Sequence, residues 1–246
     1  GLVAEDYEHA HLDIEERFMG VTERMVPGEI IDQIYNQGWA SWEPEERGHV
    51  FANQFVILSA EDKEGQSAMV RFDQRMGRVN RVGRHKEGVW GIFARNKEQL
   101  FALDLLLDDS LPLVTLDGMA GTGKTLLALA CGLKRTTDDR VYRKMLVSRP
   151  VFPLGRDVGF LPGDLEEKLN PWMKPIFDNL ELLLNSDEDR SRDRGERTPS
   201  YQPLMDQRII EVEPLTYIRG RSIPKQFLIV DEAQNLTPHE VKTVIT

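Results

Sequence analysis

Gly118-Met-Ala-Gly-Thr-Gly-Lys-Thr125 fits the pattern G-x-x-x-x-G-K-[ST] without a gap. An apolar run at residues 111–117 precedes it and predicts a buried strand, and an apolar helical pattern at residues 126–133 follows it. A strand, a glycine-rich turn and a helix in this order are typical of a loop that cradles a polyphosphate with its backbone N–H groups. The alternative, a glycine-rich turn with a chance lysine, is disfavoured by the matching context on both sides.

The residue types in this stretch predict a binding site for ATP and Mg²⁺. Lys124 is expected to place its charge on the β- and γ-phosphates, and the Thr125 hydroxyl to be a ligand of Mg²⁺. The helix that follows presents its positive end to the same anion. The candidate nucleotide-binding residues are therefore Gly118, Met119, Ala120, Gly121, Thr122, Gly123, Lys124 and Thr125.

A second acidic site follows the apolar run at residues 227–230. Asp231 and Glu232 end this run, and in a parallel sheet ligands bind at the carboxyl ends of the strands. We therefore expect Asp231 to hold Mg²⁺, through water, and Glu232 to orient or deprotonate the attacking water. Together with Lys124 these acids are candidate catalytic residues. The alternative is a strand that ends in an exposed turn.

Strand and helix patterns alternate after residue 110, which predicts an α/β domain of the P-loop NTPase type with helices on both faces of a parallel sheet. The further strands are expected at residues 145–148, 209–213 and 227–231. Helices are expected from Asn96, from Asp164 and from Thr237, each of which can cap a first turn. So few strands suggest that the domain, assigned to residues 96–246, is incomplete at its C-terminal side.

The upstream part of the chain has a different pattern. Residues 1–45 are assigned to an acidic helical segment and residues 46–95 to a small β-rich connector module. Short strands are expected at residues 55–59, 67–72 and 78–82. Residues 71–86 hold six basic side chains and one acid in a chain of net charge −10. This stripe suits a phosphate backbone, and a solvated surface remains the alternative.

Composition excludes several classes of protein. The single cysteine, Cys131, excludes a disulfide framework and a multi-cysteine zinc site. No apolar run approaches the roughly 20 residues of a membrane span, and the first residues lack a secretory pattern. We therefore expect a reduced, soluble, cytoplasmic protein of 246 residues that does not contact membranes.

Residues 88–246 resemble the PhoH family of ATPases. The resemblance rests on residues 118–125 and on Ser148-Arg-Pro150, Gly159-Phe-Leu-Pro-Gly-Asp164, Pro214-Leu-Thr-Tyr-Ile-Arg-Gly-Arg221 and Asp231-Glu-Ala-Gln-Asn235. It implies a RecA-like fold, hydrolysis of ATP, single-stranded RNA as partner with helicase-type unwinding or degradation, and a ring oligomer, a hexamer. It also places Arg219 and Arg221 near the nucleotide or a neighbouring subunit, where surface arginines are the alternative reading.

Two further assignments come from similarity to helicase-type ATPases. Gln99 resembles the glutamine that reads adenine in superfamily-one helicases, although a helix-capping glutamine fits the same pattern. Gln234 resembles the glutamine that relays the state of the γ-phosphate in those ATPases, and this resemblance makes it a further candidate catalytic residue. Arg149 is left open between a contact with nucleic acid and one with a neighbouring carboxylate.

The chain departs from the longer PhoH proteins that it resembles. Its first residues do not match their N-terminal PIN ribonuclease domain, and Thr246 ends the chain before a Gly-Asp-x-x-Gln motif or a later arginine. We therefore expect nucleotide binding to survive better than turnover. The competing functions are a nucleotide-gated oligomeric regulator without motor activity and a small-molecule kinase of the P-loop type.

Overall fold

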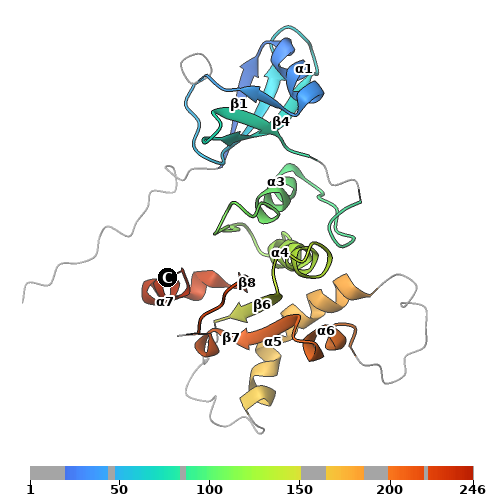
Figure 1. The fold of residues 1–246 in the computed structure, drawn as a ribbon, viewed down its shortest axis with the longest axis vertical. Helices are drawn as coiled ribbons and strands as arrows, with labels where there is room; N and C mark the ends of the chain where they lie inside the picture. Colours follow the sequence, from blue (N-terminus) through green and yellow to red (C-terminus); the bar gives the residue numbers. More distant parts are fainter. Residues whose placement is uncertain are drawn as a thin grey trace, which may run out of the picture. The chain divides into compact units, whose positions relative to one another are not determined.

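A computed structural model describes residues 20–43, 48–83, 87–150, 165–185, 199–218 and 221–245. The motif at residues 159–164, Arg219 and most of the acidic start lie outside the described residues. The chain divides into two compact units, Gly1–Arg84 and His85–Thr246, and each is described by itself (Figure 1).

The first unit is a five-stranded sheet with one helix packed against it. The strands run in the order β1-β3-β4-β5-β2, with β1 parallel to β3 and the other pairs antiparallel. The elements in chain order are β1 (Val21–Val26), α1 (Gly28–Gln37), β2 (Trp39–Ser41), β3 (Phe55–Ala60), β4 (Ser67–Asp73) and β5 (Arg78–Arg81).

Helix α1 supplies the core of this sheet. Ile31 and Ile34 are fully buried and pack in one cluster with alternate residues of the strands, among them Leu58, Val70 and Val79. Because successive side chains of a strand point to opposite faces, this cluster defines one covered face of the sheet. Gly38, at φ 87°, ends the helix in a left-handed conformation and lets β2 begin at the next residue.

The expected strands at residues 55–59, 67–72 and 78–82 are confirmed as β3, β4 and β5. The expected helical character of residues 1–45 is wrong at residues 21–26, which form β1, and at residues 39–41, which form β2. Both strands belong to the same sheet as β3 to β5, so the division expected between residues 45 and 46 cuts through one sheet. The partners of β1 and β2 lie far along the chain, and local periodicity does not show such pairing.

The second unit contains a parallel sheet of three strands in the order β7-β6-β8. These strands confirm the runs expected near residues 145, 209 and 227. The elements are α3 (Lys97–Leu106), α4 (Lys124–Leu133), a π-helical turn (Lys134–Asp138), β6 (Lys144–Arg149), α5 (Leu165–Leu184), α6 (Gln202–Asp206), β7 (Ile210–Pro214), a 3-10 turn (Leu215–Tyr217), β8 (Gln226–Val230), a 3-10 turn (Ala233–Asn235) and α7 (Pro238–Ile245).

Both faces of the three-stranded sheet are covered. On one face, Leu129 of α4 and Ile176 of α5 pack against Met145 of β6. On the other face, Leu146 packs with Leu215 of the 3-10 turn and with the residues around α7. Successive side chains of β6 point to opposite faces, so this strand contributes to a core on each side of the sheet. This agrees with the prediction of a parallel sheet that is covered on both faces.

The strand expected at residues 111–117 is absent from the ladders of the described residues. Its side chains are half-buried or exposed, and Leu113 is 58% exposed. An extended segment becomes a strand only when a neighbour pairs with its backbone, and β8 pairs only with β6 among the described strands. The apolar composition of this segment therefore did not suffice to predict a strand.

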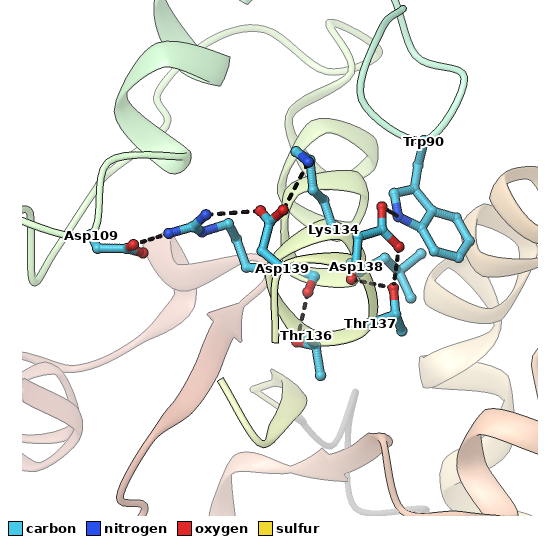
Figure 2. Close-up of polar contacts among 10 residues, drawn as sticks. Trp90, Asp109, Lys134, Thr136, Thr137, Asp138 and Asp139 are labelled. Carbon is cyan, nitrogen blue, oxygen red and sulfur yellow. Dashed lines mark hydrogen bonds and ion pairs between the residues drawn. The ribbon is translucent and has the colours of Figure 1, made fainter. Parts of the chain in front are cut away.

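The C-terminal end of α4 is anchored by polar contacts (Figure 2). Arg135 pairs with Asp109 and donates to Asp139 at 2.8 Å, and Lys134 donates to the same carboxylate at 3.0 Å. Trp90 Nε1 donates to Asp138 Oδ2 at 3.1 Å. Burial alone would raise the pKa of Asp139, but the hydrogen bonds from Lys134 and Arg135 hold that pKa below its ordinary value. The helix that begins at the glycine-rich loop is thus fixed at its other end.

Candidate nucleotide site

The glycine-rich loop leads directly into helix α4, as predicted. Gly121 and Gly123 have φ values of 77° and 88°, in the left-handed region that favours glycine. Gly123 is the N-cap, and Lys124 is the first residue of the helix. Residues 118–122 are exposed, and Met119 is 82% exposed. The helix N-terminus and its free N–H groups therefore face an accessible loop that suits an anion.

Lys124 reaches back over the loop. Its Nζ donates to the carbonyl oxygens of Gly118 at 2.7 Å and Met119 at 2.9 Å. The Thr122 hydroxyl also donates to the Met119 carbonyl, at 2.8 Å. These contacts hold the loop closed around the ammonium group. A bound phosphate would replace two carbonyl partners with a charged one, which forms a stronger hydrogen bond.

Thr125 and Asp231 join the two sites that the sequence predicted separately. The Thr125 hydroxyl donates to Asp231 Oδ1 at 2.8 Å. The backbone N–H of Asp231 donates to the Ser148 carbonyl at 2.8 Å, which fixes this residue just beyond the end of β8. The loop and the acidic pair therefore meet at the carboxyl ends of the parallel strands.

This pair of oxygen atoms fits a magnesium ion. Mg²⁺ is bound in proteins by one or two oxygen ligands together with substrate phosphates and water. Thr125 Oγ1 and one carboxylate oxygen of Asp231 are hard ligands, and only 13% of the Asp231 side chain is exposed. No group of three or more His, Cys, Asp or Glu side chains suited to a metal ion occurs within the described ranges.

Glu232 lies beside Asp231 in a more open position. Its side chain is 40% exposed, and its backbone has φ 54°, an uncommon left-handed conformation for a residue with a side chain. Gln234 Nε2 donates to Glu232 Oε2. The proposed base and the glutamine that follows it are thus in direct contact. The exposed carboxylate has the access to water that a general base needs.

The sequence left open whether Arg149 contacts nucleic acid or a neighbouring carboxylate, and the structure places it beside two carboxylates. Its guanidinium lies 3.9 Å from Asp231 Oδ2 and 3.6 Å from Glu232 Oε1, and it donates to the Trp172 carbonyl at 3.3 Å. The sequence pattern did not predict that Arg149 lies in the candidate nucleotide site. The available signal was its position at the end of β6, the strand that pairs with β8.

Gln99 makes the contacts of a capping residue and also touches the glycine-rich loop. As a capping residue, its backbone N–H donates to Asn96 Oδ1 at 2.8 Å and its Oε1 accepts from the Arg95 N–H at 2.8 Å. Its Nε2 also donates to the Thr122 carbonyl of the loop at 3.1 Å. Gln99 therefore touches the nucleotide loop, and adenine recognition stays a prediction.

The Arg221 side chain pairs with acids of the edge strand β7. It donates to Glu213 and lies 3.8 Å from Glu211 Oε2, both on β7. β6 separates β7 from β8 in the sheet, so this pairing by itself does not place Arg221 beside the nucleotide, and that position stays a prediction. The local reason is the pair of acids that β7 presents to the arginine. A role in a neighbouring subunit stays a prediction, as does the role of Arg219, which is not described.

Among the described residues, no helix combines the length and the apolar character that a bilayer crossing requires.

Comparisons with known proteins agree with these features. The family model described as PhoH, PhoH-like protein, matches residues 91–246. Over its full length the chain is 44% identical to Protein PhoH2 of Bacillus subtilis (strain 168), across 248 residues, and 36% identical to Protein PhoH2 of Mycolicibacterium smegmatis, across 256 residues. It covers 54% and 52% of those two proteins, so it spans about half their length.

A shorter match is limited to about half of the chain. The PhoH-like protein of Bacillus subtilis (strain 168) is 38% identical over 129 residues, which cover 52% of this chain and 36% of that protein.

Proposed function

Because the chain belongs to the PhoH family, a family of P-loop ATPases, we propose that it binds ATP with Mg²⁺ at residues 118–125. We further propose that it hydrolyses the bond that joins the γ-phosphate to the rest of ATP. The observation that carries the proposal is the 2.8 Å hydrogen bond between Thr125 Oγ1 and Asp231 Oδ1. This hydrogen bond supports a single pocket in which the phosphates, the metal ion and the attacking water all bind. A RecA-like sheet is the arrangement in which we expect this pocket to work.

Each residue then has a distinct task. Lys124 leaves the Gly118 and Met119 carbonyls for the β- and γ-phosphates, where its charge stabilises the transition state. Thr125 and Asp231 would hold Mg²⁺, which supplies further charge neutralisation on those phosphates. Arg149 has its guanidinium beside both acids, so it holds their positions before the substrate binds.

Glu232 is assigned to the water. Its carboxylate accepts a proton from the attacking water while the new oxygen–phosphorus bond forms and the bond from the γ-phosphorus to the bridging oxygen breaks. ADP and inorganic phosphate are the products. Gln234 donates to Glu232, so it fixes the direction of the carboxylate. The solvent access of Glu232, next to a second acid, favours water over a metabolite as the acceptor, which separates this proposal from a kinase.

We propose RNA as the partner of this ATPase, with helicase-type movement of a single strand. The support is the resemblance given above and the arginines of β4 and β5 in an acidic chain. A ring of identical subunits, a hexamer, is the proposed assembly. The exposed phosphate loop supports it, because a nucleotide bound there has a side that a second subunit can cover.

The deciding experiment is ATP turnover with and without single-stranded RNA, followed by release of inorganic phosphate. Stimulation by RNA supports the RNA-linked ATPase. Turnover that RNA leaves unchanged, with RNA bound no tighter than heparin, favours the nucleotide-gated regulator. Phosphate transferred to an added metabolite and not to water favours the kinase.

A further inference from the structure

The amino ends of the three parallel strands in the second unit carry basic residues. Arg143 directly precedes β6, Arg208 lies two residues before β7, and Lys225 directly precedes β8. The strand register, continued to these positions, brings all three to one level, and the Arg143 N–H donates to the Lys225 carbonyl at 2.8 Å. Because paired strands lie roughly 4.8 Å apart, the row spans about 10 Å along this edge of the sheet.

A surface hollow of about 560 Å³ opens beside the row. Its lining combines two guanidinium groups with an aromatic ring and aliphatic side chains: Arg140, Arg143, Tyr142, Leu204 and Ile209. Thr136 and Thr137, just beyond α4, complete the lining (Figure 2), and both hydroxyls donate to helix carbonyls at 2.7 Å. The Tyr142 ring is held edge-on against Phe227, with 5.5 Å between the ring centres. The hollow therefore suits a flat apolar body that carries an anion.

Four cations at this edge are accessible. Arg140, Arg143, Arg208 and Lys225 are exposed, and none of them forms an ion pair with another described residue. Three of them, Arg140, Arg208 and Lys225, have φ values of 53°, 57° and 53°. Glycine adopts this left-handed conformation at lower cost than a residue with a side chain does. Cationic side chains at three such turns are the kind of backbone outlier that marks a functional position.

The cations around this edge outnumber the acids. Residues 134–144, 205–211 and 224–226 hold seven basic and four acidic side chains, in a chain of net charge −10. Three carboxylates in or beside these segments are paired with cations: Asp109 with Arg135, Asp139 with Lys134 and Arg135, and Glu211 with Lys144. These pairs use none of the four accessible cations.

Two acids of these segments keep their charge. Asp138 accepts a hydrogen bond from the Trp90 ring and Asp206 accepts one from the Gln202 amide, and both donors are neutral. Four accessible cations therefore face two uncompensated carboxylates, and the local excess of charge is positive. We call the four cations and the hollow the amino-end site.

The amino-end site lies opposite the candidate nucleotide site within the same sheet. Because a strand rises about 3.3 Å per residue, Arg143 lies roughly 20 Å from Arg149 at the other end of β6. Helix α4 connects the two ends, since it begins at the glycine-rich loop and the residues that follow its last turn line the hollow. A ligand of the amino-end site therefore does not compete with ATP for the same groups.

We propose that the amino-end site binds single-stranded RNA, with one base in the hollow and the phosphates along the row of cations. A base supplies the flat apolar body and its phosphate supplies the anion, whereas the carboxylate side chains of an acidic protein have no such body. A free mononucleotide would use Arg140 and Arg143 alone, but a polymer brings further phosphates to Arg208 and Lys225. Only an unpaired base can enter the hollow, because the bases of a duplex are stacked on one another. The inference rests on the proposed RNA-linked function and deepens it by naming the surface.

The test measures binding of a fluorescein-labelled oligouridine of about 12 nucleotides to the whole chain at about 50 mM salt without ATP, by fluorescence anisotropy. The Arg143→Gln/Lys225→Gln double variant is expected to bind at least about tenfold more weakly, with a shallower salt dependence, because it loses two phosphate contacts. The matched control, Lys97→Gln/Lys174→Gln, removes the same charge from exposed positions of α3 and α5 and should bind as the wild type does.

Competition with inorganic polyphosphate of the same number of phosphates separates the base from the phosphates. Tyr142→Leu is expected to weaken the binding of oligouridine about tenfold, and to leave the binding of polyphosphate unchanged because all four cations remain. Uridine monophosphate should compete only at a far higher concentration than oligouridine, because it reaches two of the four cations. Circular dichroism checks that each variant keeps its fold.

Several results would overturn the inference. They are unchanged affinity in Arg143→Gln/Lys225→Gln, an equal loss in the matched control, no effect of Tyr142→Leu on oligouridine, and duplex RNA, polyphosphate or uridine monophosphate bound as tightly as oligouridine. The proposed ATP chemistry would still stand, because phosphate release measures it independently, and Lys124→Ala should bind RNA as the wild type does. Conversely, RNA bound at the amino-end site without any change in ATP turnover would support the inference and remove the RNA-linked motor.

Discussion

The Thr125 hydroxyl donates to Asp231 Oδ1 at 2.8 Å, although the two residues are 106 positions apart in the chain. Thr125 is the second residue of α4, and Asp231 follows the last residue of β8. The helix that starts at the glycine-rich loop therefore meets the strand that carries the acids. This contact brings two sequence motifs together at the place where we propose that a metal–triphosphate complex binds.

Replacing Lys124 with alanine should weaken the binding of ATP. The ammonium group makes a charge-assisted contact with phosphate, and its loss should cost about 1.5–3 kcal/mol. Titration with a fluorescent ATP analogue measures the change in Kd. Lys134→Ala removes the same charge from the other end of the same helix, where Lys134 pairs with Asp139, and should leave Kd nearly unchanged. Equal affinities in wild type and Lys124→Ala would count against the loop as the binding site.

Replacing Glu232 with glutamine should stop hydrolysis and keep ATP binding. The amide cannot accept the proton of the attacking water, and loss of a general base lowers turnover by at least about 100-fold. Phosphate release and nucleotide titration on the same sample separate the two effects. Gln234→Ala should lower turnover less, since it removes only the hydrogen bond to Glu232. Persistent turnover in Glu232→Gln would assign the base to another residue.

Cys131 should be unreactive in the folded chain. Burial in α4 raises the pKa of its thiol to about 12, so the thiolate that alkylating reagents attack is scarce at pH 8. Iodoacetamide should label the thiol only after unfolding in urea. Rapid labelling of the native protein would show that α4 is not packed as described.

The same shift predicts a pH dependence of stability. An ordinary thiol has a pKa of about 8.5, so the folded state keeps its proton to higher pH than the unfolded chain does. The protonated thiol makes its full contribution to the free energy of unfolding below about pH 8.5, and this contribution is lost as pH rises towards 12. The difference in unfolding free energy between wild type and Cys131→Ala should therefore shrink over this range. A constant difference would contradict the raised pKa.

Local patterns predicted the parts of the fold that depend on nearby residues. Asn96 caps α3 and accepts from the Gln99 N–H at 2.8 Å. Thr237 and Glu240 form a reciprocal pair at the start of α7, where Thr237 N donates to Glu240 Oε2 at 2.9 Å. Such caps close over three or four residues, so the sequence alone contains the information.

Features that depend on distant partners were harder to predict. Residues 21–26 become β1 because residues 55–60 pair with them, and residues 111–117 have the composition of a strand without a ladder. Arg221 pairs with acids of β7, which its motif does not indicate. For the site, residue types predicted the loop and the acids, which the structure brings into contact, whereas the contact of Arg149 with the acids required the order of the strands.

The most direct test of a single metal–triphosphate pocket is a double-mutant cycle between Thr125→Val and Asp231→Asn, measured as the affinity for ATP in the presence of Mg²⁺. Two ligands of one metal ion act as a unit, so the effects of the two changes should be non-additive by at least about 0.5 kcal/mol. Additive effects within error would place Thr125 and Asp231 in independent sites and contradict the account.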